Sequence, residues 1–308
     1  MKHSYRNCLV LLSLCCLLCA CNEKAPLDGQ LDPSAIRVVD FTGRTISLAA
    51  PARKIVALAP NVVENVFSAG AGDTLVGVMQ YSDYPAAAKQ IAIVGGYEKI
   101  NFEKIIELNP DLIIAWQTGN SHSGIQRLVE LGYTVYIDQA DSLQDVARSI
   151  RDIGVLTGHS EKSESVAAAY LEQLNQVQER YRNAAKVRTF YQVWNSPLQT
   201  ISGNHIISDA IEICGGSNIY ADEFAVAPII NIESVLQRDP DAIIASGVSS
   251  ARPQWLDQWL QWDSLSAVKQ GNLFFVNGDH IQRHTVRLLK GINAMCEKLE
   301  LARDRSHK

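Results

Sequence analysis

The sequence predicts an α/β protein made of two pseudo-repeated lobes, with one long helix joining the lobes and a ligand cleft between them. Three observations predict this fold: short apolar segments alternate with short helical ones, a long helical segment lies mid-chain, and one motif occurs twice. Alternating strands and helices are typical of a mostly parallel sheet covered by helices. The 308 residues are sufficient for two moderate domains.

The first 20 residues predict an export signal. Lys2 and Arg6 are basic, and residues 9–18 are apolar apart from one serine and two cysteines. This apolar segment is too short for a spanning helix. Residues 18–21, Leu-Cys-Ala-Cys, resemble the bacterial lipobox, so we expect Cys21 to be acylated and to become the N-terminus. The alternative is a plain secretory signal that is cleaved nearby.

The counts of cysteines and charged residues limit the possible disulfides and partners of the exported chain. Of seven cysteines, only Cys214 and Cys296 remain after the leader and the acylated Cys21. In an oxidising compartment they form either a disulfide or two separate buried thiols. Removing the leader's two basic residues from a total of 28 leaves 26 against 33 acidic ones, a net charge of −7. Without a run of basic residues, nucleic acid is not an expected partner.

The chain divides into five segments. Residues 22–35 are polar, with two prolines and a glycine, and predict a flexible tether. Residues 37–48 predict a β-hairpin that turns at Thr42-Gly43-Arg44. The predicted boundaries are a signal peptide at 1–20, the tether at 21–35, an N-terminal lobe at 36–158, a connecting helix at 159–186 and a C-terminal lobe at 187–308.

Strand and helix signals alternate through the N-terminal lobe. Gly70 and Gly132 follow helical segments, where glycine commonly ends a helix. Asn109-Pro110-Asp111 forces a turn before a buried strand. The predicted strands are 54–58, 75–79, 112–116 and 134–137, and the predicted helices are 62–70, 102–108 and 125–131.

Residues 160–186 predict the connecting helix, because they contain no glycine or proline. At about 1.5 Å per residue this helix would span roughly 40 Å. A single long helix between two α/β segments is expected to be a rigid connector. Its apolar residues recur at steps of three or four and share one helical face: Val166, Tyr170, Leu174, Val177 and Tyr181.

The motif that occurs twice covers residues 100–115 and 230–245. Each copy has Ile-Asn-x-Glu, then Pro-Asp, then a strand ending in Ile-Ile-Ala, with eight identities at an offset of 130 residues. Two homologous lobes explain this better than chance, and the period is too long for a solenoid. Glu103 and Glu233 are the acidic members, and the helix dipole favours a carboxylate in a first turn, so N-terminal capping is one interpretation of the pair.

No motif in the sequence predicts an enzyme. GxSxG, HExxH and phosphate-binding glycine loops are absent, and the Gly-Gly pairs at 95–96 and 215–216 lack the rest of a nucleotide fingerprint. We therefore expect no catalytic residue, no resident cofactor and no metal. His280 and His284, four residues apart, could share a helical face, but without a clear acidic third ligand they predict histidines at the surface or at the cleft mouth.

Aromatic residues gather at the predicted carboxyl ends of strands. Tyr81 follows the strand at 75–79, Tyr97 lies in a glycine-rich loop, and Trp116 and Trp194 lie at further strand ends. Ligands of parallel sheets bind beyond these ends. Four aromatics there suit a large, flat, partly apolar ligand. The alternative is that each one caps the core of its lobe.

Several stretches resemble the periplasmic cobalamin-binding proteins of ABC vitamin importers, in the helical-backbone class of substrate-binding proteins. They are residues 81–85 (Tyr-Ser-Asp-Tyr-Pro), 110–116 (Pro-Asp-Leu-Ile-Ile-Ala-Trp), 202–204 (Ser-Gly-Asn) and 214–219 (Cys-Gly-Gly-Ser-Asn-Ile). The resemblance runs from about residue 54 to the C-terminus. Pro-Asp-Leu-Ile marks the wider class that also binds haem, siderophores and metal ions, whereas the Tyr81 motif and Trp116 narrow it to cobalamin.

The resemblance implies two Rossmann-like lobes, one backbone helix and limited hinge motion. It also implies a disulfide between Cys214 and Cys296. The chain departs from the family at Ala227-Pro228, where a tryptophan can precede the proline, and at His280, which replaces an aromatic residue. The implied ligand contacts are Tyr81, Tyr97 and Trp116 from the N-terminal lobe, and Trp194, Asp279 and Arg283 from the C-terminal lobe.

The resemblance also implies that Glu103 and Glu233 dock on the importer. The membrane part of an importer has two equivalent subunits, and one carboxylate per lobe could meet a basic pocket on each of them. Charge pairs of this kind fix register and raise the association rate.

The expected function is capture of cobalamin by a monomeric, lipid-anchored periplasmic protein that delivers it to the membrane subunits of an ABC importer. Cobalamin is then the transported ligand. The alternative within the class is a haem or siderophore carrier, in which His280 or His284 could provide an axial ligand to haem. The remaining alternatives are a zinc or manganese carrier, and a hydrolase or oxidoreductase on a Rossmann-like fold.

Overall fold

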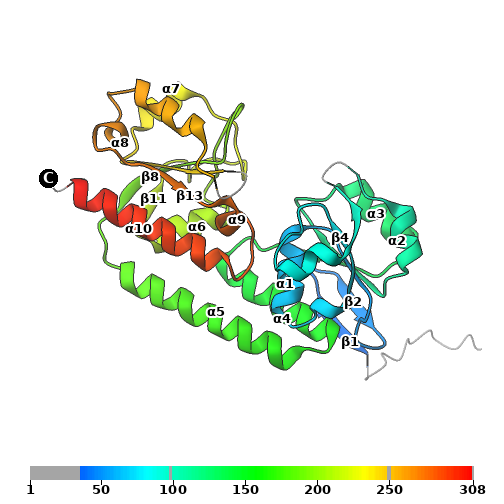
Figure 1. Ribbon diagram of the computed structural model, residues 1–308. Coiled ribbons are helices and arrows are strands. Elements are labelled where there is room, and N and C mark those ends of the chain that lie inside the picture. Colours follow the sequence, from blue (N-terminus) through cyan, green and yellow to red (C-terminus); the bar gives the residue numbers. More distant parts are fainter. Residues whose placement is uncertain (1–34, 97–98, 248–250, 307–308) are drawn as a thin grey trace, which may run out of the picture. The chain divides into compact units, whose positions relative to one another are not determined.

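The computed structural model describes residues 35–96, 99–247 and 251–306 (Figure 1). Within these ranges, each lobe contains a sheet with helices packed on it. The strands are β1 Ile36–Val39, β2 Thr45–Leu48, β3 Ile55–Ala57, β4 Leu75–Met79, β5 Ala92–Gly95, β6 Leu112–Trp116, β7 Val135–Asp138, β8 Val187–Gln192, β9 Trp194–Asn195, β10 Leu198–Gln199, β11 Gly216–Asn218, β12 Ala242–Ser246 and β13 Leu273–Val276.

Helices alternate with these strands, as the sequence predicts. None of the helices in the described ranges is long and apolar enough to cross a membrane. The helices are α1 Pro60–Ser68, α2 Phe102–Leu108, α3 His122–Glu130, α4 Leu143–Thr157, α5 Ser160–Tyr181, α6 Ile206–Ile213, α7 Ile232–Arg238, α8 Ser266–Lys269, α9 Gly278–Ile281 and α10 Leu288–Ser306, with short 3-10 helices η1 Gly72–Thr74, η2 Ala86–Gln90 and η3 Gln254–Gln261.

Both main sheets are parallel. The N-terminal sheet has the order β5-β4-β3-β6-β7 and the C-terminal sheet has the order β11-β8-β12-β13. The predicted hairpin is present as the antiparallel pair β1-β2. Parallel sheets need helices on both faces, so the predicted α/β class is confirmed.

Buried side chains form three clusters that cover both faces of each sheet. The largest cluster contains residues of both lobes together with Tyr170 and Leu174 of α5. A second cluster packs α2 and α3 on the other face of the N-terminal sheet, and a third packs α7 and η3 on the C-terminal one. Helix α5 contacts α4, α6 and α10, and Figure 1 shows it as one long helix beside α4 and α10. One hydrophobic core therefore continues past α5 from lobe to lobe.

The connecting helix is shorter than predicted. It ends at Tyr181 and not at Lys186. The amide of Ala184 donates to the carbonyl of Tyr181 at 3.0 Å, so the chain leaves the helix in a turn before it enters β8 at Val187. The predicted apolar face itself is confirmed, because four of its five members are buried and Val166 is half-buried.

The sequence repeat corresponds to a structural repeat. Helices α2 and α7 have N-cap asparagines, Asn101 and Asn231, whose side chains accept the third amide of the helix at 3.0 and 2.8 Å. Both helices end on a left-handed residue, Asn109 with φ 45° and Asp239 with φ 38°. Asparagine therefore provides the side-chain cap in both lobes.

The aspartate of each Pro-Asp turn bonds to the start of a neighbouring strand. Asp111 Oδ2 accepts the amides of Arg53 and Lys54 at 2.8 and 2.9 Å. Asp241 Oδ2 accepts the amide of Arg188 at 2.9 Å. These bonds join the turn before β6 to the entry of β3, and the turn before β12 to the entry of β8. These bonds to the start of a neighbouring strand explain why both copies of the motif have an aspartate after the proline.

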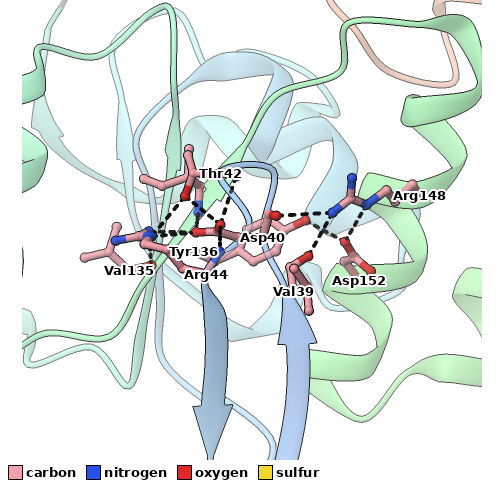
Figure 2. Close-up of polar contacts among 9 residues, drawn as sticks. Val39, Asp40, Thr42, Arg44, Val135, Tyr136, Arg148 and Asp152 are labelled. Atoms are coloured by element: carbon pink, nitrogen blue, oxygen red, sulfur yellow. Dashed lines mark hydrogen bonds and ion pairs between the residues drawn. The ribbon is translucent and has the colours of Figure 1, made fainter.

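The β1-β2 hairpin is anchored to its lobe by Asp40 (Figure 2). The buried carboxylate accepts the amides of Thr42 and Arg44 at 2.9 and 3.0 Å, and the Arg44 guanidinium at 2.7 Å. Arg44 also donates to the Val135 carbonyl, and Arg148 of α4 donates to the Asp40 carbonyl. Burial alone would raise the pKa of Asp40, but the bonds from Thr42 and Arg44 lower it below its usual value.

A disulfide joins Cys214, directly after α6, to Cys296 in α10. Both cysteines are buried. The pairing that the family resemblance implied is therefore present, and it connects the C-terminal helix to the core of its lobe.

Removing this disulfide is expected to destabilise the protein. The bridge spans a sequence separation of 82, and closing loops of this size stabilises a fold by roughly 2–4 kcal/mol in typical cases. Urea unfolding with and without reductant measures the difference, and intact mass after alkylation confirms the oxidised state. Finding two free thiols in exported protein would contradict the pairing.

Candidate functional site

A buried ion cluster connects α1 to the segment between α9 and α10. Glu64 in α1 is only 2% exposed. Its carboxylate accepts bonds from Arg283 and Arg287, both at 2.9 Å, and from the Thr285 hydroxyl at 3.0 Å. Asn65 donates to the His284 carbonyl at 3.2 Å. Glu64 is therefore a hub between the N-terminal and C-terminal lobes.

Arg283, a predicted ligand contact, is bound to several partners in this structure. Besides Glu64, it pairs with Asp83 at 3.0 Å and with Asp279 at 3.1 Å, and it donates to the Tyr81 carbonyl at 3.5 Å. Burial lowers the pKa of Arg283, but its bonds with Glu64 and Asp83 outweigh burial and raise it. The structure thus brings together three predicted site residues, Tyr81, Asp279 and Arg283.

The loop after β4 is held in an unusual backbone conformation. Tyr81 has a φ of 66°, in the left-handed region that non-glycine residues rarely adopt, and its side chain is 76% exposed. The guanidinium of Arg287 lies 4.0 Å from the ring centre of Tyr84. Arg283 and Arg287 together therefore fix this loop, and an exposed tyrosine is presented beside the ion cluster.

A cavity of about 410 Å³ lies between the lobes. Trp116 is the last residue of β6, Gln139 directly follows β7, and Val193 directly follows β8. His205 and His284 complete this part of the lining. The cavity thus lies at carboxyl ends of strands from both sheets, where parallel sheets bind ligands.

Trp116 stands at the cavity with an unsatisfied donor. Its Nε1 is buried and has no hydrogen-bond partner, whereas buried donors are normally paired. Its ring meets the ring of His284 edge-on, with centroids 6.3 Å apart. The prediction that Trp116 faces the cleft agrees with this position.

The other predicted aromatics differ in position. Trp194, in β9, is 43% exposed and donates from Nε1 to the Ser196 carbonyl at 3.0 Å. Trp194 and Tyr81 are not among the described residues that line the cavity, although Val193 is. Tyr97 lies outside the described residues, as does Cys21.

His280 and His284, which were predicted to lie at the surface or at the cleft mouth, do not share a helical face, and His284 lines the cavity. Helix α9 ends at Ile281, so His284 lies in the turn before α10. His284 is only 8% exposed and its ring lies 5.9 Å from that of His205. No local pattern predicts this pair, because the two residues are far apart in the sequence.

Both cavity histidines are uncharged at neutral pH. Burial lowers the pKa of His205 to about 4, and the neighbouring His284 adds to this effect while Asp141 opposes it. Burial also lowers the pKa of His284 to about 4, although its hydrogen bond with the Ala140 backbone acts in the opposite direction. These rings therefore add polarity without charge.

Sequence reasoning also missed two other residues. Glu64 lies in an apolar helical segment, and no local pattern indicates its partners in the segment between α9 and α10. Phe224 is 99% exposed and lies two residues before Val226, which lines the cavity. A fully exposed phenylalanine this close in sequence to a cavity-lining residue is a candidate contact for an apolar ligand.

The described ranges contain no candidate metal-binding site. No set of three or more His, Cys, Asp or Glu side chains there is arranged to hold an ion.

Glu103 and Glu233 occupy equivalent positions on α2 and α7. Both are exposed, and neither has a hydrogen-bond or ion-pair partner within the described chain. Asn101 and Asn231 provide the side-chain caps. Both glutamates nevertheless lie in the first turn of their helices, where the helix dipole favours a carboxylate, so their positions agree with the capping interpretation as well as with docking.

Comparison with known proteins places this architecture in a family. The family described as periplasmic binding protein matches residues 55–279. The chain belongs to this family. Because its members are binding proteins and not enzymes, the prediction of a non-enzyme is confirmed.

This periplasmic binding protein has relatives that match most of its length. It is 35% identical to the Vitamin B12-binding protein of Vibrio cholerae serotype O1 over 253 residues, 82% of this chain and 91% of the relative. It is 31% identical to the Vitamin B12-binding protein of Yersinia pestis, over 80% of this chain and 86% of the relative.

Solved structures agree with the fold. The crystal structure of the periplasmic Vitamin B12 binding protein BtuF of Vibrio cholerae aligns with a TM-score of 0.75 at 34% identity, covering 82% of this chain and 98% of that one. The periplasmic heme-binding protein RhuT from Roseiflexus sp. RS-1 aligns with a TM-score of 0.71 at 20% identity, covering 81% and 99%. The second match supports the fold alone.

Proposed function

We propose that this periplasmic binding protein captures cobalamin and delivers it to an ABC importer. The observation that carries the proposal is the 35% identity to a Vitamin B12-binding protein over 82% of the chain. The cavity supports it, because Trp116 and uncharged polar groups line a space between the lobes. Tyr81, Tyr97, Trp194, Asp279 and Arg283 remain proposed contacts, to which we add Phe224 as a C-terminal aromatic.

A desalting experiment tests the proposed ligand. Purified protein is incubated separately with cyanocobalamin, haem and a ferric siderophore, desalted, and examined by visible spectroscopy. We expect the cobalamin spectrum to be retained and the other two to be lost. Retention of haem or siderophore alone would establish the alternative carrier.

Replacing Trp116 with alanine is expected to weaken cobalamin binding by about 1–3 kcal/mol, the value of burying one large apolar side chain. This corresponds to a dissociation constant about 5- to 150-fold higher. Isothermal titration measures the change, and Trp116→Phe, which keeps a ring at the cavity, should lose less. If the wild type and Trp116→Ala bind cobalamin with equal affinity, Trp116 is not a ligand contact.

We further propose that the protein is exported and anchored by lipid on Cys21. The support is the lipobox-like sequence at 18–21 and the leader before it. Cys21→Ala should leave the protein without lipid, still carrying its leader or cleaved elsewhere. Labelling with palmitate tests this directly, and a wild-type protein that incorporates no label would contradict the anchor.

Docking on the importer is proposed for Glu103 and Glu233. Their exposure, their lack of partners and their equivalent places on α2 and α7 support this role. An importer with two equivalent membrane subunits offers two equivalent basic sites. One glutamate per lobe would then fix the orientation of the binding protein.

A further inference from the structure

The cavity between the lobes presents very little charge to a ligand. Asp141 is the single charged side chain among the described residues that line it. Arg283, next to His284 in sequence, does not line the cavity, and its positive charge is already paired with Glu64, Asp83 and Asp279. The lining thus provides no described cation for an anionic group of a ligand.

His205 is held in one tautomer by helix α6. It is the N-cap residue, and its Nδ1 accepts the amide of Ile207 at 3.1 Å. A neutral imidazole whose Nδ1 accepts a hydrogen bond carries its hydrogen on Nε2. The positive end of the helix dipole also opposes protonation of this ring. His205 therefore offers the cavity a neutral N–H donor.

His284 and Trp116 continue the same wall. The ring planes of His205 and His284 are 83° apart, and those of His284 and Trp116 are 80° apart. Nδ1 of His284 is buried without a partner, as is Nε1 of Trp116. The three rings together form a polar but uncharged surface, which we call the three-ring wall.

We propose that the three-ring wall makes His205 a specificity-determining residue, whose Nε2–H donates to an amide carbonyl on the rim of the bound corrinoid. The proposal rests on the proposed function. A corrinoid rim carries primary amides, whereas haem carries carboxylates. Burying a carboxylate without a paired cation is costly, so the cavity selects the amide-bearing ring.

Corrinoids that differ by one rim group test the selection on the unaltered protein. Cyanocobalamin is compared by isothermal titration, at neutral pH, with its monocarboxylic acids, in each of which one amide is hydrolysed. We expect at least one positional isomer to bind about tenfold more weakly or worse. If every isomer binds within twofold of cyanocobalamin, the inference is overturned.

A substitution at His205 tests the donor. His205→Ser keeps a good helix cap but removes the ring N–H, and cyanocobalamin affinity should fall about 3- to 10-fold. His122→Ser, at an exposed histidine of α3, is the matched control and should change nothing. Unaltered affinity in a folded His205→Ser protein would refute the donor role.

The outcomes separate this inference from the proposed function. If the wild-type protein does not bind cyanocobalamin, both the proposed function and the role of the three-ring wall are refuted. If it binds cyanocobalamin and the monocarboxylic acids equally well, only the selection by the three-ring wall is refuted.

Discussion

Replacing Glu103 and Glu233 together with alanine is expected to abolish cobalamin uptake and to leave cobalamin affinity unchanged. Both side chains are exposed, and neither is bonded within the described chain, so their loss should cost the fold little. Surface substitutions of this kind usually change stability by about 0.5 kcal/mol or less. The loss should therefore appear at the importer, where charge pairs fix register and association rate.

Uptake of labelled cobalamin and association with the purified importer measure this effect. Glu103→Arg with Glu233→Arg should be worse than the alanine pair, because like charges would then face each other. Glu161→Ala with Glu172→Ala, on the exposed side of α5, removes the same charge and should leave uptake normal. Normal uptake by the folded Glu103→Ala, Glu233→Ala protein would show that the repeated motif has only a structural role and that its glutamates do not dock on the importer.

Glu64→Gln is expected to lower the free energy of unfolding by about 3–5 kcal/mol, the cost of leaving a buried charge without its partner. Arg283 would keep Asp83 and Asp279, but Arg287 has no other carboxylate among the described residues. Cobalamin binding should weaken too, since these arginines hold the loop that presents Tyr81.

Urea unfolding and isothermal titration measure the two consequences of Glu64→Gln. Glu161→Gln, at an exposed position on α5, is the matched control and should stay within about 0.5 kcal/mol of the wild type. If the free energy of unfolding of Glu64→Gln differs from that of the wild type by less than about 0.5 kcal/mol, as for a surface substitution, Glu64 does not stabilise the fold.

Much of the fold follows from local sequence patterns. The repeated motif predicted equivalent elements, and the structure has α2 and β6 in one lobe and α7 and β12 in the other. The apolar face of α5 could be predicted from its spacing, because helical periodicity is a local property. The end of α5 could not, since the turn at Ala184 depends on where β8 begins.

The candidate site was predictable only in part. The aromatic residues at strand ends indicated that the ligand site lies at the carboxyl ends of the strands. Trp116 lines the cavity at this position. The partners of Glu64 lie more than 200 positions away in sequence, so no periodic pattern connects them. The meeting of His205 with His284 likewise depends on tertiary packing.

Isothermal titration of the chain from about residue 33 with cyanocobalamin, in parallel with haem, distinguishes a cobalamin carrier from a haem carrier. We expect saturable binding of one cyanocobalamin per chain and no comparable binding of haem. No heat and no binding with cyanocobalamin, together with clear binding of haem, would contradict this expectation.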